Sequence, residues 1–303
     1  MMIRKDFITS LSFLVGGAAL APLAGLSKTL HPTEALRLKK GLQFGMIKEE
    51  LSLVDKFKLV KDLGFDGIEL NSPVPFEIKE LLQAKTQSGI EIPSTINKDH
   101  WSKPLSDPDP AVRQFTIDSV KKSLEETKEL GGDTVLVVPG VVNEKVSYEK
   151  AYNNAIDSVR KLIPYVEKTG IKIGLENVWN NFILSPIEAR DFVDKIDHPL
   201  IGWYFDIGNI FRYGWAEHWI ETLNKRIIKL HIKEFSVEKM NKEGLWKGFD
   251  VELTEGSINW PVVMKAVKEV NYKGQWLTAE VGGGDREHLQ KISKQMDKIL
   301  EYY

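Results

Sequence analysis

The sequence predicts a single (β/α)₈ barrel, an α/β fold in which eight parallel strands alternate with helices. From Gly41 onward, a short apolar run is repeatedly followed by a longer amphipathic segment that usually ends at a glycine. Eight such units match the size of this barrel, and nearly continuous apolar strands suit a parallel sheet covered by helices. A doubly wound open sheet is the structural alternative. No GxGxxG follows the first strand, which removes the dinucleotide-binding form of that alternative.

Each predicted strand is a short apolar run bounded by turn residues. In chain order the eight runs are 42–47, 65–70, 90–96, 133–139, 171–176, 200–206, 227–232 and 275–281. The longest irregular stretch, residues 233–258, follows the seventh run. Because the loops after barrel strands build the active site, we expect this stretch to be an active-site loop.

Helices are expected between the strands, and three segments carry clear signals: 51–64, 107–132 and 259–274. The first has apolar residues near helical spacing and stops at Gly64, and the second stops at Gly131. The third has Asn259 as its expected N-cap residue and Pro261 in its first turn. Gly274 is expected to mark the end of this third helix.

The composition excludes several classes of function. The formal net charge is −2 and there is no long run of like charges, which disfavours nucleic acid or an acidic membrane as the main partner. The chain has no cysteine, so disulfides, thiolate nucleophiles and cysteine-type zinc sites are excluded.

Residues 1–38 are predicted to be an export signal and leader, and residues 39–303 the catalytic barrel. Arg4 and Lys5 precede a mainly apolar run, 11–26, which contains small residues and is short for a membrane-spanning helix. The start resembles a twin-arginine signal with Lys5 in place of the second arginine, and a Sec signal is the other form. We therefore expect export to the periplasm. An uncleaved membrane-surface anchor, or a cytoplasmic protein whose leader does not function, is the alternative.

Charged side chains stand at the ends of four consecutive predicted strands: Glu176, Asp206, His231 and Glu280. In a barrel these ends meet at one rim, where three carboxylates and an imidazole would be costly without a divalent cation. Any one of them alone is more often a helix cap, an ion pair or a structural hydrogen bonder. Oxygen ligands with one imidazole suit Mn²⁺, the preferred expectation, and also Mg²⁺, Co²⁺ or Zn²⁺.

Glu176 and Glu280 come from strands on nearly opposite sides of the predicted barrel, so a metal-chelating sugar would lie between them. One glutamate could take a proton from a carbon beside a carbonyl, and the metal would hold the resulting enediolate. The other glutamate could return a proton to the opposite face, which is epimerisation. Return of the proton to the neighbouring carbon would be aldose–ketose isomerisation.

Seven short stretches carry a resemblance to a known family: "GFDGIELNSP" (64–73), "HWSKPLSDPDPAVR" (100–113), "LENVWNNFILSP" (175–186), "YFDIGN" (204–209), "LHIKEF" (230–235), "LTEGSINW" (253–260) and "AEV" (279–281). In this order and spacing, the sequence resembles the sugar isomerase/epimerase superfamily of xylose-isomerase-like barrels. It is most similar to the L-ribulose-5-phosphate (L-xylulose-5-phosphate) 3-epimerase and hexulose-phosphate isomerase-like branch.

The resemblance implies roles for individual positions. It makes Glu176, Asp206, His231 and Glu280 the metal ligands, with the two glutamates also serving as the acid/base pair. It further implies that four residues face a small sugar substrate: Glu69, His100, Asn209 and Lys233. Relatives in this superfamily commonly form homo-oligomers, so the chain can be expected to do the same.

Two positions bear on which sugar is held. Asn209 stands where 3-epimerases of free ketoses usually carry histidine, which agrees with the phosphosugar branch, and Glu234 replaces an aspartate common in that branch. The predicted export signal argues against a phosphorylated substrate, since phosphosugars are scarce outside the cytoplasm. We therefore expect an unphosphorylated sugar or a glycoside-derived substrate. Tryptophans in or near the last four units have aromatic faces that suit stacking on sugar rings: Trp179, Trp215, Trp246 and Trp260. Mid-strand Trp203 is expected to pack inside the sheet or against helices instead. Trp101, beside His100, could form a pocket wall or be a surface aromatic held by packing.

Three other functions are compatible with parts of the pattern. The same site could act as a metal-dependent lyase or dehydratase on keto-sugars or keto-glycosides. A non-enzymatic sugar-binding barrel would keep its affinity without the metal site. An abasic-site endonuclease would need several more strand-end histidines and a basic groove, and this chain offers only His231 at a strand end.

Overall fold

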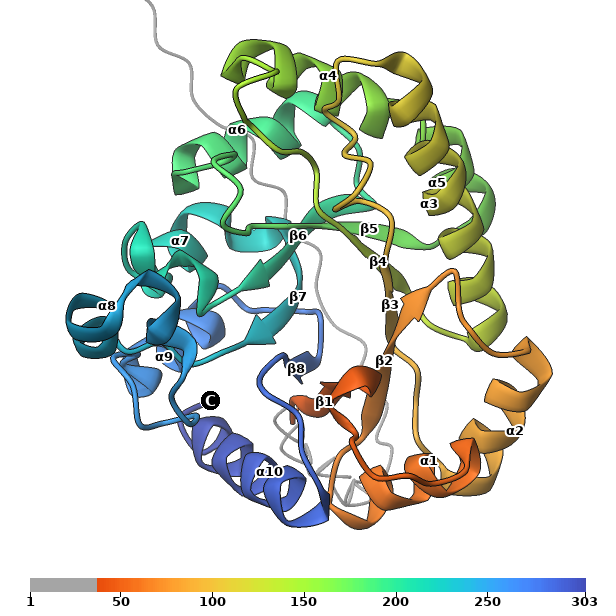
Figure 1. Cartoon of the computed structure of the whole chain (residues 1–303), viewed down its shortest axis with the longest axis vertical. Coiled ribbons are helices and arrows are strands. Elements are labelled where there is room, and N and C mark those ends of the chain that lie inside the picture. The colour runs from red at the N-terminus through yellow and green to blue at the C-terminus, as the bar shows by residue number, and fades with distance from the viewer. Residues whose placement is uncertain (1–36) are drawn as a thin grey trace, which may run out of the picture. The chain divides into compact units, whose positions relative to one another are not determined.

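The computed structural model describes residues 37–303, which fold into a closed barrel of eight parallel strands surrounded by helices (Figure 1). The predicted export signal falls outside the described residues. The strands are β1 (Lys39–Gln43), β2 (Gly67–Ser72), β3 (Ser94–Asn97), β4 (Thr134–Val137), β5 (Lys172–Glu176), β6 (Ile201–Asp206), β7 (Ile227–Ile232) and β8 (Trp276–Ala279). Each strand pairs with the next in the chain, and β8 pairs with β1, which confirms the predicted (β/α)₈ barrel.

The first and third strands differ most from the sequence prediction. β1 begins three residues before the predicted run. The sequence prediction missed this start because Lys40 interrupts the apolar pattern. Lys40 is nevertheless buried in the strand, where its Nζ reaches Asp297 Oδ1 at 2.6 Å. The predicted run's later residues form a short 3₁₀ helix, η1 (Phe44–Met46). β3 starts only at Ser94 because Pro93 has no N–H for the ladder.

The helices occupy the expected segments between strands, and the connections after β4 and after β7 each contain one additional α-helix. The α-helices are α1 (Leu53–Asp62), α2 (Ile78–Ser88), α3 (Pro110–Leu130), α4 (Tyr148–Arg160), α5 (Ile163–Thr169), α6 (Pro186–Ile196), α7 (Ala216–Leu223), α8 (Val237–Glu243), α9 (Trp260–Glu269) and α10 (Arg286–Leu300). Further 3₁₀ helices are η2 (Asn209–Arg212), η3 (Asn224–Arg226) and η4 (Leu245–Phe249). Within residues 37–303, no helix combines the length and apolar character that crossing a membrane requires.

The helix boundaries test the predicted caps. Gly131 ends α3 with a left-handed φ of 78°, as predicted. Asn259 stands at the N-cap of α9, although its side chain makes no capping hydrogen bond. The prediction for Gly274 is wrong, since α9 ends at Glu269 and Asn271 takes the left-handed conformation, with φ 53°. Gly274 is needed for another reason, because a Cβ there would collide with the backbone oxygen of Ile228.

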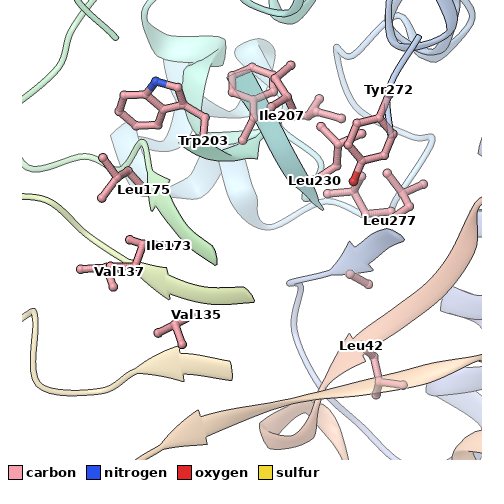
Figure 2. Close-up of a cluster of buried hydrophobic side chains, with 14 of the residues drawn as sticks. Leu42, Val135, Val137, Ile173, Leu175, Trp203, Ile207, Leu230, Tyr272 and Leu277 are labelled. Carbon is pink, nitrogen blue, oxygen red and sulfur yellow. The ribbon is translucent and has the colours of Figure 1, made fainter. Parts of the chain in front are cut away.

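The alternation of side chains along the strands separates the core from the site. Apolar residues such as Leu175, Trp203 and Leu230 lie on the outer side of the strands, where they meet the helices (Figure 2). Trp203 donates its indole N–H to the Ala189 carbonyl of α6 at 2.9 Å, as expected for a residue packed against a helix. Since successive residues of a strand point to opposite faces, their neighbours such as Glu176 point into the barrel.

The long stretch after β7 is more regular than predicted, because it contains α8 and η4. Its end is fixed by the buried carboxylate of Glu234, which accepts hydrogen bonds from Thr254 N at 2.8 Å and from the Trp260 indole at 2.8 Å. Close packing holds η4 as well, since a Cβ at Gly248 would collide with the Phe235 ring. The stretch is therefore an ordered segment that follows β7 at the barrel rim.

Candidate active site

The barrel brings the four predicted strand-end residues together. Glu176 and Asp206 are the last residues of β5 and β6, His231 pairs in register with Asp206, and Glu280 directly follows β8. One ligand atom from each lies within 4.8 Å of every other. Glu176, Asp206 and His231 are buried, and the Glu280 side chain is 30% exposed. We refer to these four residues as the carboxylate–histidine cluster.

His231 is held between carboxylates on both sides of its ring. Its Nε2 lies 2.7 Å from Glu69 Oε2, and its Nδ1 lies 2.9 Å from Glu280 Oε2 and 3.4 Å from Glu176 Oε1. Burial alone would lower the pKa of His231, but the charge of Glu69 and close contacts with all three carboxylates raise this pKa well above its ordinary value. Nδ1 is therefore the ring atom that faces the cluster.

Glu69 does not occupy the position that the sequence predicts for it. The resemblance implies that it faces a substrate, whereas it is 1% exposed and lies beneath His231, apart from the residues that line the cavity. Its Oε1 accepts hydrogen bonds from Tyr204 Oη at 2.6 Å and Ser94 Oγ at 2.7 Å. Burial raises the pKa of Glu69, but its contacts with His231 outweigh burial and lower that pKa.

Asp206 is fixed by two asparagines. Asn209 N donates to Asp206 Oδ1 at 2.8 Å. Asn177 bonds the backbone of Asp206 in both directions, accepting from its N–H and donating to its carbonyl at 3.1 Å each. The Asn209 side chain in turn donates to the Asn177 carbonyl at 2.9 Å. Asn209, predicted to face the substrate, lines the cavity and also supports the cluster.

Lys233 places a partly buried ammonium group among these oxygens. Its Nζ lies 3.2 Å from Asp206 Oδ2 and 3.3 Å from Glu280 Oε2, and it donates to Asn209 Oδ1 at 3.2 Å. Burial lowers the pKa of Lys233, but the attraction of Asp206 and Glu280 outweighs burial and raises that pKa. Lys233 is therefore a cation that partly compensates the carboxylates.

The cluster fits a divalent cation. Asp206 Oδ2 and Glu280 Oε2 are buried oxygens that make ion-pair contacts but lack a hydrogen bond of good geometry. Leaving buried carboxylate oxygens without donors is costly, and a bound cation would remove that cost. Three carboxylates and one imidazole within 4.8 Å are a donor set that could bind a metal ion.

The two glutamates of the cluster have unlike electrostatic environments. Burial, together with the nearby charge of Glu280, raises the pKa of Glu176 to about 7. Burial also acts to raise the pKa of Glu280, but Lys233 and His231 outweigh it and bring that pKa well below its usual range. Carboxyl pairs whose pKa values are pushed apart are typical of acid/base partners.

A cavity of about 570 Å³ opens directly above the cluster. His100, at the start of the loop after β3, lines it, and its Nδ1 accepts a hydrogen bond from Val138 N at 3.2 Å. The ring is therefore neutral with a proton on Nε2, and burial agrees with this by lowering the pKa of His100 to about 3. The rest of the lining is largely aromatic and aliphatic and includes Trp101, Trp179, Trp246, Phe249 and Val251.

Comparison with known proteins decides the family. The model of the xylose isomerase-like TIM barrel family matches residues 57–301, which is most of the chain. The chain belongs to that family.

Individual relatives in this xylose isomerase-like group are distant. The chain is 27% identical over 239 residues to the uncharacterized protein MJ1311 of Methanocaldococcus jannaschii, with 74% of this chain and 77% of that one covered. It is 21% identical to L-ribulose-5-phosphate 3-epimerase UlaE of Escherichia coli, over 79% of this chain and 87% of that one. Among solved structures, 3-keto-D-glucoside 4-epimerase YcjR of E. coli superposes with a TM-score of 0.70 at 17% identity, over 87% and 99% of the two chains. This last likeness shows the fold alone.

The sequence prediction missed several residues of this xylose isomerase-like site, including Tyr204, Ser94 and Phe249. Tyr204 and Ser94 hold Glu69, and Phe249 lines the cavity. Tyr204 could have been found, because it stands two residues before Asp206 and so shares its face of the strand. Ser94 and Phe249 carry no comparable signal, since their positions depend on where β3 begins and how η4 folds.

Proposed function

We propose that the protein is a metal-dependent sugar epimerase or isomerase in which Glu176 and Glu280 are the proton-transfer pair. The observation that carries this proposal is the gathering of both glutamates with Asp206 and His231, ligand atoms within 4.8 Å, at the floor of a cavity on the catalytic rim of the barrel. One relative named above supports the same class of reaction, because it is a sugar-phosphate epimerase by name.

Each residue has a defined task in this proposal. A divalent cation held by the carboxylate–histidine cluster would supply Lewis acidity to the sugar's carbonyl oxygen. One of the two glutamates, as a carboxylate, takes the proton from the carbon beside the carbonyl, and the electron pair of that C–H bond moves toward the carbonyl oxygen. The other glutamate, carrying a proton taken up from water, delivers that proton to the opposite face of the same carbon, so no oxidant or reductant is needed. His100 Nε2–H and Lys233 Nζ donate hydrogen bonds to the substrate's oxygens.

Deuterium exchange tests the proposal. The purified protein, loaded with Mn²⁺, is incubated in D₂O with free ketoses, phosphoketoses and 3-keto-glycosides, and products are followed by NMR. We expect deuterium at the carbon beside the carbonyl, together with a stereoisomeric or isomeric product. Loss of water or of an aglycone would assign a lyase instead. Absence of exchange with every sugar and every divalent metal tried would refute the proposal.

Metal affinity should depend on pH. In the metal-free protein the pKa of His231 is well above its usual value, and the pKa of Glu176 is raised to about 7. His231 Nδ1 and the Glu176 carboxyl therefore hold protons that a cation must displace. Mn²⁺ should therefore bind more tightly as pH rises from about 6 to about 8, by up to about tenfold per pH unit for each proton released. Titration calorimetry in buffers of different ionisation enthalpy measures both affinity and proton release. Binding that is independent of pH in this range would contradict the assigned ligands.

A further inference from the structure

One side of the cavity mouth is lined by the aromatic side chains of Trp179, Trp246 and Phe249, which pack on the buried ring of Phe235. We call these four residues the aromatic wall. The Trp179 ring lies 4.9 Å from both the Trp246 and Phe249 rings and 5.6 Å from Phe235, between centroids. The Trp179 indole N–H donates to the Asn209 carbonyl at 2.6 Å. The wall is thus tied to the residues that support Asp206, so its distance from the cluster is fixed.

A further tryptophan stands on the other side of the mouth. Trp101 follows β3, while Trp246 follows β7, and these strands are four apart in a closed ring of eight, so they lie on opposite sides of the barrel. Both indoles line the cavity, yet Trp101 is 54% exposed and Trp246 is 64% exposed. Two large exposed aromatic faces across one opening are suited to holding a flat apolar face between them.

The charges of the cavity do not suit a phosphate group. Among the described residues that line it, Lys233 is the only one with a permanent positive charge, and its Nζ is already within 3.3 Å of Asp206 and Glu280. His100 is neutral, because its Nδ1 accepts the Val138 N–H. Arg212 stacks on Trp179, 5.3 Å from its ring, and is not part of the lining. A dianion would thus meet three lining carboxylates, Glu176, Glu234 and Glu280, with no unpaired cation to receive it.

We infer that the mouth of the cavity is a second sugar-ring subsite and that the substrate is an uncharged keto-glycoside. This inference rests on the proposed function. The ring bearing the ketone lies at the cluster, and the C–H face of the second ring lies between Trp101 and the aromatic wall. The cavity, at about 570 Å³, holds more than one hexose ring. The reaction is inversion beside the ring ketone, in which one C–H bond breaks, one forms on the opposite face, and the glycosidic bond stays intact.

The test compares substrates that differ only in the second ring. Mn²⁺-loaded full-length protein is assayed by deuterium exchange with a 3-keto-disaccharide, the matching methyl 3-keto-glucoside and ketopentose 5-phosphates. We expect kcat/KM for the 3-keto-disaccharide to exceed that for the methyl glycoside at least tenfold, mainly through KM. Trp246→Ala and Trp101→Ala should each lose at least tenfold more kcat/KM on the disaccharide than on the methyl glycoside, and Trp246→Phe should restore most of the loss.

Trp215→Ala is the matched control. Trp215 is also a highly exposed tryptophan, at 62%, but it lies outside the cavity lining, so its removal should change neither rate. If phosphoketoses are the best substrates, or if the disaccharide preference is unchanged in Trp246→Ala and Trp101→Ala, the inferred subsite is wrong while the proposed function stands. If no sugar exchanges deuterium, both fail.

Discussion

Replacing Glu176 by glutamine should lower the rate of deuterium exchange by at least about 10³-fold. The amide has nearly the shape of the carboxylate, but it can neither take up nor deliver the proton and is a weak metal ligand. We also expect the purified Glu176→Gln protein to retain much less Mn²⁺, measured as bound metal per chain. Glu280→Gln should lose activity similarly, because it stands on the other side of the same reacting carbon in the proposal.

The Glu176→Gln variant should nevertheless fold well. Because the pKa of Glu176 is raised to about 7 in the folded protein, its carboxyl contributes stability below its unfolded pKa of about 4.5, and that contribution is lost as pH rises through about 7. Glutamine carries no such charge. Without metal, the variant should therefore unfold at the same temperature as the wild type or at a higher one near pH 8, which calorimetry measures.

Glu221→Gln provides the control for this pair of measurements. Glu221 lies on the exposed face of α7 and takes no part in the cluster, so metal content and exchange rate should match the wild type. Full metal content and wild-type exchange in Glu176→Gln would place the reacting site elsewhere. A large loss of thermal stability in the same variant would instead mean that Glu176 is a structural residue.

The four cluster residues could be predicted because strand ends are a strong signal in this fold. Parallel strands that close into a barrel must meet at one rim, so polar residues at the ends of neighbouring strands become neighbours in space. Glu176, Asp206 and His231 each end or nearly end an apolar run, and the pairing of Asp206 with His231 follows from the register of adjacent strands. The prediction did not require knowing any helix position.

What lies above and below the cluster could not be predicted in the same way. The aromatic wall depends on how residues 245–249 coil into η4. That conformation is set by the packing of Gly248 on Phe235 and by the hydrogen bonds of Glu234. None of these contacts follows from the hydrophobic pattern of a strand. The position of Glu69 depends on how deep in the barrel its side chain lies, which the hydrophobic pattern of the strand does not indicate. It stands mid-strand in β2, one layer below the rim, so its carboxylate meets His231 from beneath.

That depth makes Glu69 the second residue whose replacement should have a large effect. Glu69→Ala would leave His231 Nε2, Tyr204 Oη and Ser94 Oγ without the carboxylate that they now share. Removing one partner of a buried ion pair typically costs about 3–5 kcal/mol. We expect a loss of this size in the free energy of unfolding, measured by chemical denaturation of the metal-free protein.

Glu69→Gln separates the two tasks of this carboxylate. The amide keeps the volume and can still accept a hydrogen bond, so the loss of unfolding free energy should be smaller than in Glu69→Ala. It cannot supply the negative charge that holds the His231 ring with Nδ1 toward Glu176 and Glu280. Loss of such a supporting partner typically weakens metal binding about 10–100-fold, and we expect that change in the Kd for Mn²⁺.

Ser94→Ala is the matched control, since it removes one donor to Glu69 but leaves its contact with His231, and it should shift the Kd far less. An unchanged Kd in Glu69→Gln would mean that the barrel walls alone orient His231, and that Glu69 only fills and neutralises the interior beneath it.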